Sequence, residues 1–424
     1  MDEKIYREYV AILKEELQPA MGCTEPIAVA YCAALARRTL GALPETVEVL
    51  ASANIIKNVK SVIVPNTNGQ RGIAAAAAAG IVSGNADAQL QVLASLTPEQ
   101  VDAVGAYLQQ AAFTVRRADK DYVFDIQVRV TAGTDSASVE IAGYHTNVIR
   151  IEKNGVVQFH KDYQESGSQH ATDRSVLTVE HIIAFANEVD IADVQETLQR
   201  QIDYNWAIAE EGLRGDYGAN IGRILLQSYG MSIHNRAKAY AAAGSDARMN
   251  GCDLPVVINS GSGNQGLTAS LPVIVYAREL GVTQQMLYRA LVVSNLVTIH
   301  LKTGIGSLSA YCGATAAGCG AAAGVTYLYG GQFREIAHTI VNAIAIDSGM
   351  ICDGAKASCA AKIASAVEAG LLGMQMQMHE SQFYGGDGIV VKGVENTIRN
   401  IGTLASEGMR ETDRTIIRMM IQEH

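Results

Sequence analysis

Hydrophobic positions near the start of the chain recur at the spacing of an α-helix. In residues 4–17 the apolar side chains share one helical face, at Ile5, Tyr9, Ile12, Leu13 and Leu17. Pro19 ends this predicted helix. A second, alanine-rich stretch at about residues 25–40 predicts another helix, which Thr24 can cap. Cys23 therefore precedes a helix N-terminus, where the helix dipole favours a thiolate.

The pattern changes after residue 44. β-Branched residues dominate residues 46–65, which predicts strands there, and the turn-rich Pro65-Asn66-Thr67-Asn68-Gly69 follows. Further helices are predicted at residues 72–83 and 98–112, alternating strands at 122–130 and 138–151, and a hairpin at Asn154-Gly155. Together these elements predict a small α+β module over residues 44–165.

From about residue 176 the chain reads as helices joined by glycine-rich turns, with few convincing strands. The expected fold class is therefore α+β: a large, mainly α-helical domain, made of residues 1–43 and 166–424, with an inserted smaller α+β module, residues 44–165. Residues 73–82 and 314–328 are apolar, but they are too short for a bilayer and consist of Ala and Gly, which is typical of tightly packed interior helices.

Composition and charge narrow the possible partners. The chain has 424 residues, 48% of them hydrophobic, and a formal charge of -10, with no Lys/Arg-rich run. This charge excludes the electrostatic signature of nucleic-acid binding or of an anionic membrane surface, so small molecules are the expected partners. Enzymes of this size are commonly symmetric, and a homodimer is expected. The charged N-terminus has no signal-peptide pattern, which predicts a cytoplasmic protein.

Seven cysteines, an odd and irregularly spaced set, argue against a disulfide framework. Cys23, Cys312 and Cys352 stand in glycine-rich or turn-like segments that suit ligation better than packing. A cluster held by three thiolates leaves one iron open to a substrate atom and acts as a Lewis acid. Cys319 and Cys359 each lie seven residues after one of these cysteines, and spacing does not choose between them. Burial as small hydrophobes is the competing interpretation for all seven.

Two turn segments offer polar groups for a substrate. The stretch Ser260-Gly261-Ser262-Gly263-Asn264-Gln265-Gly266 follows an apolar run and precedes a predicted helix. Its backbone N–H groups, with the side chains of Ser260, Ser262, Asn264 and Gln265, suit the carboxylate of an amino acid. A tight connector between helices is the alternative. Asn66 and Thr67 form a second candidate, for which ordinary turn chemistry competes.

A general base is expected among the lysines and histidines near these segments. Lys356, three residues after Asp353, is the first candidate, and His300 is the next, followed by Lys302 and His338. A buried lysine beside a cationic iron would favour its neutral form, which proton abstraction from carbon requires. A histidine in a helical run is more often a core residue.

With these segments in view, the chain resembles the L-cysteine desulfidase family, relatives of the iron–sulfur L-serine dehydratase α chain, nearly end to end. The resemblance is carried by several separate motifs in one order: Gly22-Cys23-Thr24-Glu25-Pro26, residues 54–58 with Pro65-Asn66-Thr67, residues 260–266, residues 308–313 and Cys352-Asp353-Gly354-Ala355-Lys356.

The resemblance implies a [4Fe-4S] cluster on Cys23, Cys312 and Cys352, with Cys319 and Cys359 as packing or neighbouring residues. It also implies conversion of L-cysteine to pyruvate, ammonia and sulfide without pyridoxal phosphate, with the substrate sulfur on the open iron. Two alternatives stay open: L-serine dehydration by the same mechanism, and a non-enzymatic protein that binds an amino acid.

Overall fold

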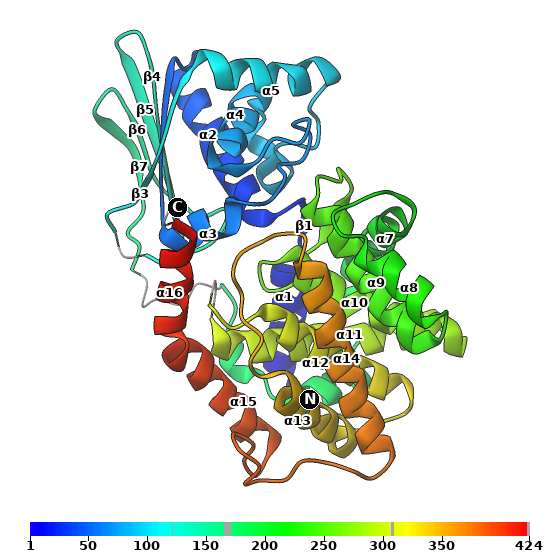
Figure 1. Cartoon of the computed structure of the whole chain (residues 1–424). Coiled ribbons are helices and arrows are strands. Elements are labelled where there is room, and N and C mark those ends of the chain that lie inside the picture. Colours follow the sequence, from blue (N-terminus) through cyan, green and yellow to red (C-terminus); the bar gives the residue numbers. More distant parts are fainter. Residues whose placement is uncertain (121, 165–170, 307–308, 422–424) are drawn as a thin grey trace.

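Among the described residues, the two large hydrophobic cores lie one around a sheet and one among helices. Figure 1 shows the sheet-containing part and the helical part. We describe it from a computed structural model, over residues 1–120, 122–164, 171–306 and 309–421. The expected α+β class, mainly helical, is confirmed.

Over the described residues the first core is built on a six-stranded mixed sheet with strand order β3-β2-β4-β5-β6-β7. Strands β2 and β3 run parallel, and the other neighbours are antiparallel. Their bounds are β2 Thr46–Ala51, β3 Ala112–Arg117, β4 Asp125–Ala132, β5 Asp135–Ala142, β6 Val148–Lys153 and β7 Val156–His160. The predicted hairpin at Asn154-Gly155 is confirmed: it joins β6 to β7, with φ of 50° and 80°, as a type I′ turn requires.

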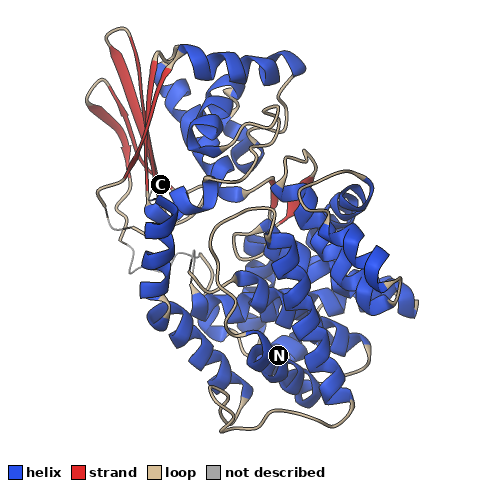
Figure 2. Ribbon diagram, viewed as in Figure 1, coloured by secondary structure: helices blue, strands red, loops and turns tan. Residues whose placement is uncertain are grey.

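Three helices lie on one side of this sheet: α2 (Thr24–Leu40), α4 (Gly72–Ser83) and α5 (Pro98–Gln110), with the short η1 (Ala86–Gln91) beside them (Figure 2). The alternate residues Ile126, Val128 and Val130 of β4 are buried against α2, as the period of a strand predicts. Helix α4 approaches α2 so closely that a Cβ at Gly80 would lie 1.9 Å from the carbonyl oxygen of Ala30. The division at residue 43 assigned α2 to the helical domain, but its side chains belong to the core of the sheet.

The strands predicted throughout residues 46–65 are wrong beyond Ala51. Residues 53–59 form helix α3 (Ala53–Val59), and Ser52 caps it by accepting the N–H of Ile55 at 3.4 Å. Ile55 and Val59, four residues apart, both point into the core of the sheet. Local capping and this helical spacing outweigh the β propensity of the segment.

The second core consists of helices from both ends of the chain. Residues of α12 are buried along the whole helix, and a Cβ at Gly318 would lie 2.4 Å from the Ala366 carbonyl oxygen of α14, so these small residues do pack interior helices. The bounds are α1 Glu3–Glu16, η2 Arg174–Val176, α6 Val179–Glu188, α7 Ile191–Arg214, α8 Ile221–Tyr229, α9 Ile233–Met249, α10 Gly263–Leu280, α11 Gln284–Ile305, α12 Gly313–Leu328, α13 Phe333–Asp347, α14 Cys359–Met378, α15 Val394–Thr403, η3 Leu404–Gly408 and α16 Arg410–Ile421.

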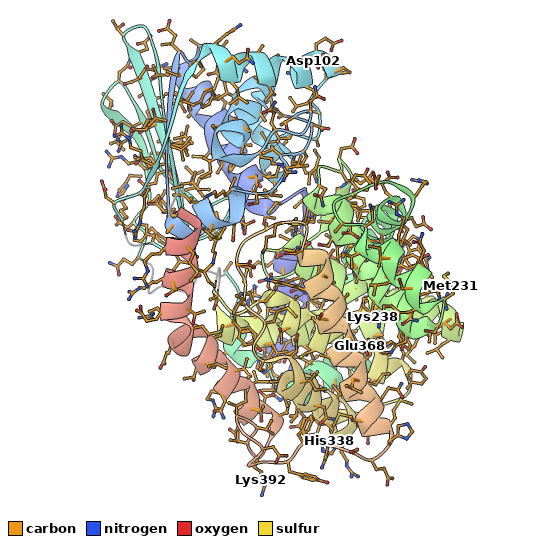
Figure 3. All side chains as sticks on the ribbon, in the orientation of Figure 1. Asp102, Met231, Lys238, His338, Glu368 and Lys392 are labelled. Carbon is orange, nitrogen blue, oxygen red and sulfur yellow. The ribbon has the colours of Figure 1, made fainter. Side chains whose placement is uncertain are left out.

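Helices α9 and α14 run side by side in this core, where Lys238 and Glu368 form an ion pair of 2.5 Å (Figure 3). Over the described residues, no helix combines the length and the apolar character that crossing a membrane demands.

Segments near both ends of the chain connect the helical part to the sheet. Strand β1 (Pro19–Met21) pairs antiparallel with β8 (Pro255–Val257), so the chain enters α2 directly beside the loop that precedes α10. At the other end, α16 runs back toward the sheet (Figure 1) and contacts α3, where Lys57 and Asp413 pair at 2.6 Å. The junction between the two cores is therefore lined by segments from the whole length of the chain.

Candidate functional site

The junction brings Cys23 beside the glycine-rich loop. Cys23 is the N-cap residue of α2, and the β1–β8 pairing holds it next to residues 259–262. The next residue, Thr24, donates its hydroxyl to the carbonyl of Gly261 at 3.0 Å. On the other side, Gly22 has a φ of 63°, and a Cβ there would lie 2.3 Å from Cγ of Pro65. The Pro65 turn and the loop thus enclose the start of α2.

Cys312 and Cys352 lie on two short segments that pair with each other. Tyr311 and Ile351 form a bridge, the N–H of Cys312 donates to Met350 O at 3.0 Å, and the N–H of Cys352 donates to Ala310 O at 2.6 Å. The two side chains are hydrogen-bonding neighbours. The interaction with Cys312, followed by the nearby charges of Lys57 and Lys302, lowers the pKa of Cys352.

Two lysines bring positive charge to this cysteine pair. The side chain of Lys57 is only 1% exposed, and Lys302 lies on α11. Burial lowers the pKa of Lys302 to about 8, although the sulfurs of Cys352 and Cys312 oppose that shift. Since isolated thiolates are costly to bury, these cations stabilise anionic sulfur here.

The loop that carries Cys352 packs against α3. Gly354 has a φ of 93°, and a Cβ there would lie 2.4 Å from the backbone carbonyl of Lys57. A side chain at position 354 would therefore push the Cys352 loop away from α3 or strain both segments.

We expect Gly354→Ala to destabilise the protein by about 2 kcal/mol more than Gly72→Ala, because both add a side chain at positive φ but only Gly354 also meets backbone. Gly72 is a matched control, with a φ of 89° and no atom within 4 Å of the added Cβ. Urea unfolding of both variants measures the difference. Equal losses would show that the close approach to Lys57 costs nothing.

Among the remaining cysteines, Cys359 is the one that interacts with both members of the pair. It begins α14, its thiol contacts Gly354 O at 3.6 Å, and it interacts electrostatically with both Cys352 and Cys312. Cys23 packs in one small apolar cluster with Cys359. Burial and the charge of Glu25 raise the pKa of Cys23, and its thiol donates to Oε2 of Glu25 at 3.1 Å. Cys319 lies inside the helical core.

A buried polar group that the sequence analysis missed adjoins Cys23. Glu25 accepts hydrogen bonds from Cys23, from Thr24 at 3.0 Å and from Nδ2 of Asn58 at 3.0 Å. Burial would raise the pKa of Glu25, but His145, the Cys23 thiol and Arg248 lower it on balance. Glu25 stands within the Gly22–Pro26 motif, which could have pointed to it, and Arg248 is a cation in an alanine-rich helix. No local pattern marks His145.

The four predicted loop residues fall at the start of α10. Ser260 donates its N–H to Oε2 of Glu16 at 2.7 Å, and Ser262 is the N-cap residue. Gln265 is 6% exposed and lies directly against Gly313, whose Cβ would stand 2.6 Å from the Gln265 side chain, so the loop borders Cys312. Asn264 donates to the Met249 sulfur at 3.6 Å.

The second predicted turn has a structural role. Asn66 has a φ of 55° and donates to Leu93 O at 3.0 Å, and Thr67 donates to Val64 O at 2.6 Å. These bonds shape the Pro65 turn that packs on Gly22.

The predicted bases lie in different places. Lys356 lies in the Cys352 loop and donates to Asp353 at 2.5 Å and to Gly354 O at 3.2 Å. His300, on α11, pairs with Glu395 of α15 at 2.7 Å. His338 lies at the end of the helical part remote from the sheet (Figure 3).

The donor set suits an iron–sulfur group. Over the described residues, no three His, Cys, Asp or Glu side chains stand in a ready metal-binding arrangement. However, two thiols are neighbours, a third interacts with them electrostatically, and the charges of Lys57 and Lys302 offset theirs. Thiolates are the ligands of such clusters, so these residues fit the group.

Comparison with known proteins identifies the class. Residues 87–418 match the profile of the serine dehydratase alpha chain family, so the chain belongs to that family, and the predicted relationship is confirmed. The family indicates a serine dehydratase-like protein, which suggests a lyase with an iron–sulfur cofactor.

Relatives match the chain from end to end. A UPF0597 protein of Desulfitobacterium hafniense is 56% identical over 421 residues, covering 99% of this chain and 98% of the relative. A UPF0597 protein of Lachnoclostridium phytofermentans is 49% identical over 417 residues, covering 98% and 100%. One from Bacteroides fragilis is 38% identical over 426 residues, covering 99% of each.

Proposed function

We propose that this protein is an L-cysteine desulfidase, which eliminates sulfide from L-cysteine with a [4Fe-4S] cluster and without pyridoxal phosphate. The observation that carries the proposal is the close approach of Cys312 and Cys352, beside Lys57, Lys302 and the α10 loop, in a chain of the serine dehydratase alpha chain family. In the overall reaction, L-cysteine and water give pyruvate, ammonia and hydrogen sulfide.

Cys312 and Cys352 are proposed as two ligands. Cys23 is the third by resemblance, and Cys359 is its rival. When bound, the cluster would supply a Lewis acid that withdraws charge from the leaving sulfur. The remaining tasks belong to side chains and backbone at the junction of the two cores.

The start of α10 is proposed to hold the substrate, through backbone N–H groups and the side chains of Ser260, Ser262, Asn264 and Gln265. Asn66 and Thr67 would shape the opposite wall. Lys356 is the proposed acceptor of the Cα proton, with His300 as second candidate. Loss of that proton and of the Cβ–S bond yields aminoacrylate, which hydrolyses to pyruvate and ammonia.

L-Serine is the second candidate substrate, and the family match itself favours it. Serine differs from cysteine only in the leaving atom, so the same contacts to its carboxylate and ammonium would serve.

The proposal predicts equal amounts of sulfide and pyruvate from L-cysteine, dependent on iron. The test is anaerobic purification with iron reconstitution, followed by both assays, with L-serine in parallel. If only serine yields pyruvate, the chain is a dehydratase. If iron binds and neither amino acid reacts, the lyase proposal is wrong.

A further inference from the structure

Arg248 is a buried cation that forms no ion pair with a carboxylate among the described residues. It is 2% exposed, at the last turn of α9. Within the part of the chain that the structure describes, its Nε has no hydrogen-bond partner, and Nη1 reaches only the Met249 sulfur, at 4.0 Å. A guanidinium removed from water in this way is costly unless an anion joins it.

Glu25 is the nearby acid that could have paired with Arg248, and it does not. Its charge interacts with Arg248. However, its two oxygens accept from Cys23, Thr24 and Asn58. The guanidinium of Arg248 is therefore available to bind another anion.

The guanidinium lies against the N-terminus of α10. A Cβ at Gly263, the first residue of that helix, would lie 2.2 Å from Nε of Arg248 and 2.7 Å from its Cζ. Helix α10 runs over 18 residues, and its N-cap residue, Ser262, makes no side-chain cap hydrogen bond. Its backbone N–H groups and its dipole thus point at the same place as the unpaired arginine.

Other buried polar atoms around this place also have no partner among the described residues: Nε2 of His145, Oδ1 of Asn58, Oδ1 of Asn264 and Oε1 of Gln265. They come from both sides of the junction between the cores. Native interiors leave few such atoms unpaired, so their concentration here indicates that a polar ligand completes the site.

The place adjoins the cysteines. Met249, next to Arg248, packs in the cluster of Cys23 and Cys359, and Gln265 lies against Gly313, next to Cys312. A small ligand held at Arg248 would therefore extend toward the thiols.

We propose that Arg248, together with the N-terminus of α10, binds the α-carboxylate of the amino-acid substrate. A carboxylate is planar and accepts two parallel hydrogen bonds, which the guanidinium fork matches. The inference rests on the proposed function and adds to it the residue that selects α-amino acids over simple amines.

Two ligands separate this role from general support of the site. L-Alanine carries the carboxylate and ammonium but no leaving atom, whereas cysteamine carries the thiol and ammonium but no carboxylate. We expect Arg248→Gln in the cluster-loaded protein to weaken L-alanine binding about 30-fold, the loss typical of charge-assisted hydrogen bonds, and to leave cysteamine binding unchanged. Anaerobic calorimetry measures both affinities.

Arg236→Gln is the matched control. Arg236 lies on the same helix about three turns earlier. Its Nε also has no partner among the described residues, and it pairs with Glu279 near the surface. This variant should move neither affinity. Arg248→Lys keeps the charge but loses the two parallel hydrogen bonds of the guanidinium, so it should weaken L-alanine binding about 3-fold. If Arg248→Gln does not fold, Arg248→Lys provides the test.

Equal losses for L-alanine and cysteamine, or no loss for either, would overturn the proposal. So would a wild-type protein that binds cysteamine but not L-alanine. If the expected pattern appears while neither cysteine nor serine yields pyruvate, Arg248 keeps its role and the lyase function alone fails.

Discussion

Replacing Cys312 or Cys352 by serine is expected to abolish both iron retention and lyase activity. The two thiols are hydrogen-bonding neighbours, and their segments pair through the backbone, so each sulfur has a defined place. Serine keeps the size of the side chain, but its hydroxyl is a poor ligand for iron at neutral pH. Iron and sulfide content after anaerobic reconstitution, with pyruvate release, measures the effect.

The fold should survive these substitutions. Cys312 is the N-cap residue of α12 and makes no side-chain cap hydrogen bond, whereas serine is a favoured N-cap. The control is Cys319→Ala, seven residues along the same helix and buried in the core, which should keep its iron and lose only modest stability. Full iron in either serine variant would remove that cysteine from the ligand set.

Elements with strong local signals were predicted correctly. The alternating strand β4 follows from the period of its apolar residues, the Asn154-Gly155 hairpin from turn chemistry, and helix α4 from its run of alanines, all of which act within a few residues. Helix α3 was missed because a capping Ser52 and two buried residues four apart outweigh its β-branched composition. Propensity is the weaker influence wherever a cap and a core face agree.

The candidate site was predictable only in part, because its parts meet through long-range packing. The sequence picked out Cys23, Cys312, Cys352 and the α10 loop by their glycine-rich settings, and the structure brings all these segments to one junction. Arg248 and His145 were missed, since neither belongs to a sequence motif and the role of each depends on the atoms packed around it. An unpaired buried group is a property of the tertiary structure, not of a motif.

The second large effect concerns the third ligand, for which Cys23 and Cys359 compete. Cys23 was predicted by resemblance. Its thiol, however, donates to the carboxylate of Glu25 at 3.1 Å, and the negative charge of Glu25 disfavours a thiolate there. Cys359 interacts electrostatically with both members of the pair and begins helix α14 directly after the Cys352 loop. On these contacts we expect Cys359→Ala to lose iron as completely as Cys352→Ser.

Cys23→Ala is the comparison that decides between them. If Cys359 is the third ligand, the Cys23 variant keeps its iron, and removal of a thiol beside Glu25 alters turnover alone. If Cys23 is the ligand, it loses iron while Cys359→Ala keeps it. Glu25→Gln is an independent test, because it removes the negative charge that opposes a Cys23 thiolate. The iron content should stay unchanged if Cys359 binds the cluster, whereas iron should bind more tightly if Cys23 does.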